Sequence, residues 1–215
     1  MQSKRMESDW AAENLRVIRT LMERSAVYRR ALAPTTLLVG GIGLGAAFIG
    51  WMAGVQTPRA FGIYWLCVCL VAIIGAFLVV RRQALRESEP FWSPPTRRVA
   101  QALLPGFFAG LVCGILILAP GNDPGQAWWL PPVWMVLYGL TLHSAGFFMP
   151  RGIRLFGWIF VLCGCAVLAA LRVQNQGNGL PETVQAHGLM GATFGALHVA
   201  YGVYLSFTEK RKNEM

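Results

Sequence analysis

The sequence predicts an all-α integral membrane protein with six transmembrane helices and an N-terminal amphipathic helix on the cytoplasmic side. Three observations lead to this prediction. Of the 215 residues, 55% are hydrophobic and only 13% are charged, about half of the charged share of a soluble domain. Six apolar runs are each long enough to cross a bilayer, which takes roughly 17–25 residues. Lysine and arginine gather in every second connector between those runs.

Residues 1–30 form the first predicted element. Charged residues occur throughout this segment, so it lacks the apolar core of a signal peptide. Ser8 or Asp9 can cap a helix that runs to about Ser25. Its apolar side chains form one stripe, which predicts a cytoplasmic amphipathic helix that lies on the inner leaflet or on the ends of the bundle. The stripe residues expected to contact a partner or the lipid surface are Leu15, Ile18, Leu21 and Met22.

The transmembrane domain is predicted over residues 31–208, and a basic tail follows at 209–215. Prolines and glycines interrupt the chain between the apolar runs, for example at Pro58 and Pro150, and these residues end helices. The predicted spans cover about residues 32–54, 60–80, 99–119, 128–149, 153–171 and 186–207.

The basic residues orient the predicted helices. All but two of the 19 lysines and arginines fall on one side of the predicted bundle, and the exceptions are Arg59 and Arg172. The positive-inside rule assigns the basic side to the cytoplasm, so both termini are expected there. The loop over residues 81–98 lies on the same side and adds Phe91 and Trp92 to the predicted cytoplasmic face. The net charge of +9 is thereby explained without a nucleic-acid partner.

The distribution of acidic residues disfavours ion coupling and catalysis. All ten lie outside the predicted spans, whereas coupled carriers usually hold a carboxylate inside the bundle. The three histidines form no HExxH-type pair, and no Ser-His-Asp set or zinc-ligand spacing occurs. The sequence therefore offers no catalytic residue and no metal site, and an enzyme is not the expected class.

Glycines at four-residue spacing mark the predicted packing faces. Small residues at this spacing let helix backbones approach closely in lipid. Such contacts hold helices of one chain together or join two copies in a homo-oligomer, and the spacing leaves both open. The glycines of the third and sixth spans assigned to packing are Gly106, Gly110, Gly114, Gly188, Gly191, Gly195 and Gly202, and the first span has Gly41, Gly45, Gly50 and Gly54.

Two histidines are the candidates for a cofactor site. His143 and His198 lie in parallel spans, at depths that agree within about 5 Å at 1.5 Å per residue. They can ligate a b-type haem from both sides, or they can form hydrogen bonds between helices with neighbours such as Tyr138. Both interpretations, haem b or no cofactor, stay open. His187 is expected near the outer interface, in contact with water.

A weak internal echo relates the second and fifth spans. Arg59-Ala-Phe61-Gly62 is echoed by Arg154-Leu-Phe156-Gly157, and the two spans are predicted to cross in opposite directions. This pattern is typical of the inverted repeats of transporters. Chance similarity between apolar helices is the alternative.

The segments 18–25, 138–146 and 187–202 resemble a group of bacterial six-helix inner-membrane proteins to which no activity is assigned. The resemblance covers nearly the whole chain, and it implies a location in the bacterial inner membrane and hints at a regulatory role.

Three functions remain open at this stage. The leading hypothesis is a non-enzymatic scaffold or sensor-like regulatory partner that binds a cytoplasmic protein through its cytoplasmic face. The first alternative is a small transporter or channel for an uncharged or anionic solute. The second alternative is a haem-binding electron-transfer protein that uses His143 and His198.

Overall fold

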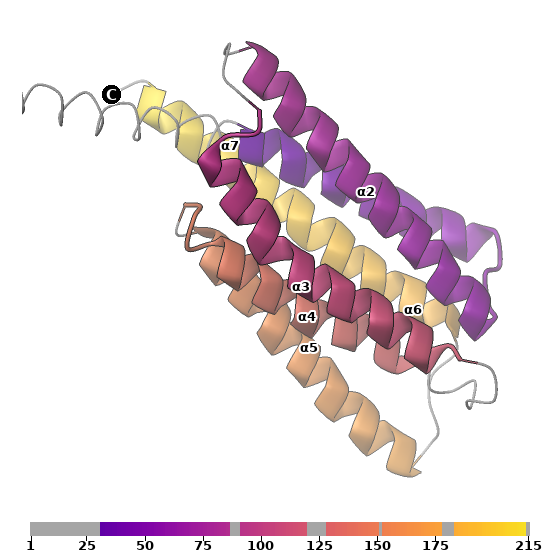
Figure 1. Cartoon of the computed structure of the whole chain (residues 1–215). Coiled ribbons are helices and arrows are strands. Elements are labelled where there is room, and N and C mark those ends of the chain that lie inside the picture. Colours follow the sequence, from indigo (N-terminus) through magenta and orange to yellow (C-terminus); the bar gives the residue numbers. More distant parts are fainter. Residues whose placement is uncertain (1–30, 87–90, 120–127, 151, 178–182, 214–215) are drawn as a thin grey trace, which may run out of the picture.

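The computed structural model in Figure 1 describes residues 31–86, 91–119, 128–150, 152–177 and 183–213. These ranges contain helices and turns and no strand. The amphipathic helix predicted within residues 1–30 lies outside the described residues, so it stays a prediction. The first described helix, Ala31–Met52, carries no label in Figure 1. The others are α2 (Pro58–Arg86), α3 (Pro94–Ile117), α4 (Leu130–Ala145), α5 (Gly152–Gly177), α6 (Thr183–Met190), the π-helix η2 (Gly191–Leu197) and α7 (His198–Asn213).

Five helices are long and apolar enough to cross a membrane, and they match five of the six predicted spans. The segments that meet this description are Ala31–Met52, Pro58–Arg86, Thr96–Ile117, Gly152–Asn175 and Thr183–Thr208, the last of which joins α6, η2 and α7 in one rod. In the apolar part of α2, only 6% of the residues are buried. An apolar helix so little covered by its own chain suits contact with lipid tails.

The predicted fourth span, residues 128–149, is regular helix only over the 16 residues of α4. At 1.5 Å per residue this helix is about 24 Å long, which is less than the roughly 30 Å of a bilayer core. Pro131 and Pro132 lie in its first turn, where their missing N–H groups cost nothing. Trp128 and Trp129 form a 3₁₀ turn before it, and the chain turns again after Gly146.

Glycines bring α3 and α5 against α4 on two sides. Gly106 of α3 faces Thr141 of α4, and Gly110 faces Trp134, whose indole N–H also donates a 2.8 Å hydrogen bond to the Gly110 carbonyl. The α4–α5 contact brings backbone against backbone. A Cβ placed on Gly139 of α4 would lie 2.6 Å from the carbonyl oxygen of Gly157 on α5.

The first helix packs antiparallel against the rod formed by α6, η2 and α7 (Figure 1). A Cβ on Gly43 would lie 2.7 Å from the carbonyl oxygen of Phe194, and one on Gly195 would lie 2.8 Å from the backbone nitrogen of Leu44. These distances are shorter than real Cβ contacts, so only glycine permits the approach. Similar contacts continue along both helices and join Gly202 with Leu37, Gly40 with Val199, Gly191 with Ala47 and Gly50 with His187.

The expected glycine stripes need four corrections. Gly188, Gly41, Gly45 and Gly54 face open space, with no atom near the position of a Cβ, and Gly54 lies in the turn after the first helix at φ 63°. Gly188 precedes Gly191 by three residues, which rotates it about 60° away from the contact stripe. The glycines that meet the last helix from the first helix are Gly40, Gly43 and Gly50, which lie on a different face from Gly41 and Gly45.

We predict that Gly43→Ala destabilises the bundle, because its methyl group meets the Phe194 carbonyl. Overpacking of this kind typically costs about 1–3 kcal/mol. The matched control is Gly41→Ala, where the methyl group meets nothing and alanine is the better helix former. The measurement is the unfolding temperature of both variants in detergent. Equal unfolding temperatures would contradict the packing described for the first and last helices.

Candidate functional site

His187 lies in an aromatic box formed by α2. Its side chain is only 1% exposed, and its ring centroid lies 5.0 Å from that of Phe61, 5.7 Å from Tyr64 and 6.0 Å from Trp65. The Trp65 indole N–H donates to Nδ1 over 3.2 Å, and Nε2 lies 3.0 Å from the carbonyl oxygen of Val55. Because an indole only donates and a carbonyl only accepts, the proton must sit on Nε2. The ring is therefore a neutral imidazole with both nitrogens paired.

The position of His187 corrects the expectation of a water-exposed side chain. Side chains of α2 cover the ring, and Gly50 of the first helix leaves the space that the ring fills. A Cβ on Gly50 would lie 2.5 Å from Nδ1 of His187. Val55 belongs to the turn between the first helix and α2, so the histidine joins three elements. Its geometry is that of a structural residue.

His198 lies in a second aromatic box, formed by α4, α5 and the π-helix. The side chain is 2% exposed. Nε2 and the hydroxyl of Tyr138 are hydrogen-bonded over 2.7 Å. The rings of Phe156, Phe160 and Phe194 pack around the imidazole, with centroid distances of 5.1, 5.4 and 6.4 Å.

The other nitrogen of this ring, Nδ1, is buried and has no hydrogen-bond partner among the described residues. The carbonyls of Thr193 and Phe194 lie beside the ring, but outside hydrogen-bonding geometry. The π-helix ends here, and the backbone N–H of His198 donates to Gly195 instead of Phe194, its partner in a regular α-helix. Irregular helical turns of this kind are frequent at functional sites, and a buried polar atom without a partner calls for an explanation.

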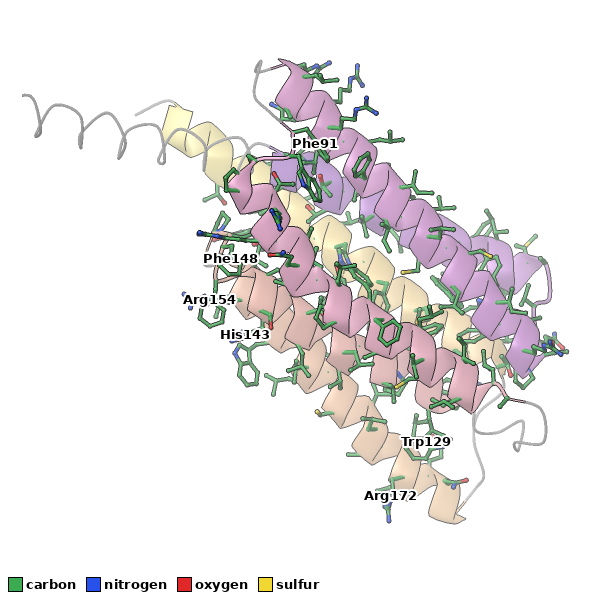
Figure 2. The ribbon with its side chains drawn as sticks, viewed as in Figure 1. Phe91, Trp129, His143, Phe148, Arg154 and Arg172 are labelled. Atoms are coloured by element: carbon green, nitrogen blue, oxygen red, sulfur yellow. The ribbon has the colours of Figure 1, made fainter. Side chains whose placement is uncertain are left out.

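The structure does not bring His143 to His198. The ring neighbours of His143 are Phe147 and Trp158, at 5.5 and 5.7 Å, and none of the described rings contacts both histidines. Tyr138 and His143 are five residues apart, which separates their directions by about 140° on α4. Tyr138 points to α7, so His143 points to the outer face, and Figure 2 shows it at the edge of the bundle.

The residues around His198 do not fit a haem ligated from both sides. Nε2 of His198 is already paired with Tyr138, and aromatic side chains pack around the imidazole where a macrocycle would have to lie. The other candidate ligand, His143, faces elsewhere. No group of three histidine, cysteine or acidic side chains gathers within the part of the chain that the structure describes.

The sequence echo between the second and fifth spans corresponds to a shared packing arrangement. Phe61 meets His187 edge-on at 5.0 Å and 69°. Phe156 meets His198 edge-on at 5.1 Å and 87°. In each case the phenylalanine of a Phe-Gly pair packs its ring on a buried histidine of the last rod. The glycine of the pair contacts a different helix: Gly62 contacts Leu118 at the end of α3, and Gly157 contacts α4. Sequence spacing alone did not indicate these two boxes.

An aromatic loop segment, residues 91–93, directly precedes α3. The ring of Phe91 packs on Phe77 with a centroid distance of 4.8 Å. The Thr96 hydroxyl donates to the Phe91 carbonyl over 2.8 Å. Because that hydroxyl proton is used, the Ser93 hydroxyl donates to Thr96 over 2.9 Å. These bonds tie residues 91–93 to the first turn of α3, while Trp92 stays 62% exposed.

Exposed arginines surround this loop and define a surface that we call the basic end. Its members are Arg81, Arg82, Arg86, Phe91, Trp92, Arg97 and Arg98. Figure 2 places Phe91, Phe148 and Arg154 toward one end of the bundle, and Trp129 and Arg172 toward the other. The two ends of the described helices therefore differ in charge in the way that the sequence predicts.

No protein-family model, curated protein or solved structure matches the chain. What the protein does must therefore be inferred from its own residues.

We predict that Trp65→Phe destabilises the fold, because it leaves Nδ1 of His187 buried without a donor. Such an orphaned acceptor costs about 1–3 kcal/mol. The control is Trp51→Phe, since Trp51 is 56% exposed. The measurement is the unfolding temperature in detergent. An equal effect of the two substitutions would contradict the assigned hydrogen bond.

We also predict a featureless visible absorption spectrum for protein purified from haem-replete cells, both oxidised and dithionite-reduced. The reason is that the described ligands do not face one another. A Soret band that disappears in His198→Ala would overturn this reading of the site.

Proposed function

We propose that the chain is a non-enzymatic six-span protein of the bacterial inner membrane, with both termini in the cytoplasm. In this proposal it acts as a scaffold or regulatory partner, and its basic end binds an acidic segment of a cytoplasmic protein. Residues 1–30, which lie outside the described part, complete the proposed cytoplasmic face.

The arrangement of α4 supports six crossings. Its glycine contacts with α3 and α5 are antiparallel, so the chain reverses direction at both ends of α4. Trp129 and Phe148 flank this helix and lie toward opposite ends of the bundle (Figure 2). The turns that extend α4 let the short helix cover more of the bilayer. A crossing by α4 brings the chain back to the basic end, where Arg154 begins α5 on the cytoplasmic side.

The observation that carries the proposed function is the exposed side chain of Trp92. Its neighbours Phe91 and Ser93 are held by contacts with Phe77 and Thr96, whereas the indole of Trp92 is 62% exposed. Tryptophan and arginine are the residues most enriched at the energetic centres of protein interfaces. An exposed tryptophan beside Arg97 and Arg98 suits a partner with apolar and acidic groups.

The interior of the bundle supports a static role. The first helix and the last rod meet at backbone distance through Gly43 and Gly195. His187 uses both ring nitrogens to hold elements together. Packed interfaces of this kind resist gradual deformation. This suits a protein that acts by binding partners at its surface.

A small transporter is the second candidate, and one observation favours it. The π-helix lies between His187 and His198 along the last rod, and broken helices are typical of transporters. Solute flux into proteoliposomes that is lost in His198→Gln would favour this candidate over the scaffold.

We predict that a photo-crosslinking amino acid at Trp92 captures a cytoplasmic protein in living cells. The same group at Phe108, which is 69% exposed on the side of α3, should capture only lipid. Because the proposed contact is electrostatic, Arg97→Gln with Arg98→Gln should remove the protein adduct. Arg59→Gln, at the opposite end, should leave it unchanged.

Deletion of residues 1–25 should also weaken the adduct if that segment belongs to the binding face. Lipid adducts alone at position 92, or an adduct indifferent to Arg97 and Arg98, would contradict the proposal.

A further inference from the structure

A cluster of four side chains lies on the outer face of α4 and α5. The guanidinium carbon of Arg154 lies 5.2 Å from the ring centroid of Phe147. The ring of His143 lies 5.5 Å from Phe147 and 5.7 Å from Trp158. The four side chains therefore form a continuous group, which we call the outer cluster. Figure 2 shows His143 and Arg154 near each other at the edge of the bundle.

Helix geometry explains why these residues meet. His143 and Phe147 are four residues apart on α4, and Arg154 and Trp158 are four residues apart on α5, so each pair lies on one helix face. Because the helices are antiparallel, Phe147 is level with Arg154, and His143 is level with Trp158. The second layer lies about 6 Å deeper in the membrane at 1.5 Å per residue. Gly146 leaves room for the aliphatic part of Arg154 to cross α4.

The outer cluster combines polar groups with an apolar strip. Arg154 and His143 are half-buried, and Nδ1 of His143 has no hydrogen-bond partner among the described residues. The strip continues along α5 away from the basic end, at turns of the helix that face outward. Its exposed members are Leu155 (68%), Ile159 (44%) and Leu162 (63%). A charged head beside the first turn and an apolar strip below it match the shape of a phospholipid.

Charge favours an anionic lipid over a neutral one. The α4–α5 hairpin contains no aspartate or glutamate from residue 124 to residue 181, so neither of the two helices that form the outer cluster provides a carboxylate for Arg154. Arginine binds phosphate with paired, charge-assisted hydrogen bonds. Arg154 lies in the first turn of α5, at the depth where a cytoplasmic-leaflet headgroup is expected. Trp158, 50% exposed one turn deeper, is typical of the interfacial region.

We propose that the outer cluster is a binding site for an anionic phospholipid of the cytoplasmic leaflet. The Arg154 guanidinium binds the phosphodiester, and an acyl chain lies along Leu155, Ile159 and Leu162. Lipid binding at this site does not require a cytoplasmic protein partner, so its test is independent of the test of the proposed function.

The first test is native mass spectrometry of the delipidated full-length protein, titrated with phosphatidylglycerol, phosphatidylcholine or inorganic phosphate. We expect selective retention of phosphatidylglycerol. Arg154→Gln should weaken its binding about fivefold, the value expected for one arginine near an anionic headgroup. The matched control is Arg172→Gln, which removes an exposed arginine from the other end of α5 and should change nothing.

A second measurement needs no change at Arg154. Phosphatidylglycerol with brominated acyl chains should quench the fluorescence of Trp158, isolated as the difference between wild type and Trp158→Phe. Brominated phosphatidylcholine should quench it less. This arm keeps the proposal testable if Arg154→Gln fails to fold.

Four results would overturn the proposal. The first is equal retention of the two lipids by wild type, and the second is equal loss in Arg154→Gln and Arg172→Gln. The third is binding of inorganic phosphate as tight as that of phosphatidylglycerol, which would indicate an anion site without a lipid. The fourth is a change from dimer to monomer in Arg154→Gln, which would show that a second copy of the chain covers this face.

Discussion

The approach of the first helix to the last rod at backbone distance is the constraint on which the rest of this structure depends. In a membrane, helices gain nothing from hiding apolar surface from lipid, so close packing and hydrogen bonds must hold them together. Glycines on both partners provide that packing here, from Gly202 beside Leu37 to Gly50 beside His187. The first helix occupies one side of the last rod, and the two buried histidines of the rod contact the other helices: His187 meets α2, and His198 meets α4 and α5.

This division explains the two histidine boxes and the surfaces outside them. Aromatic side chains of α2 cover His187, and those of α4, α5 and the π-helix cover His198. Because the interior of the bundle is closely packed, the side chains that are free to bind other molecules lie at its periphery. The basic end exposes Trp92, and the outer cluster holds Arg154 at the outer face of α4 and α5. The proposals above assign the interactions of the protein to these two surfaces, with the closely packed bundle as their support.

Much of the architecture could be predicted from the sequence, whereas the site could not. Long apolar runs and proline-rich connectors are local features, so the helical class and five of the spans followed from composition and length. Spacing indicated that glycines pack, but not that Gly43 faces inward while Gly41 faces outward, because the rotation of a helix depends on its partner. The same limit applies to His143 and His198. Their similar depth in the membrane did not show in which direction each side chain points from its helix. The π-helix before His198 has no sequence pattern that distinguishes it from an α-helix.

The most direct test of the central contact is disulfide formation in a variant that lacks the five native cysteines. The pair Ala47→Cys and Gly191→Cys should cross-link under mild oxidation, since a Cβ on Gly191 lies beside the Cβ of Ala47 and meets no backbone atom of the first helix. The pair Ala47→Cys and Gly188→Cys should stay reduced, because Gly188 faces open space. Cysteines joined in a disulfide do not react with a maleimide-linked polymer, so the absence of the polymer's mass shift on a gel reports the bond. Equal cross-linking of both pairs, or none in either, would contradict the account.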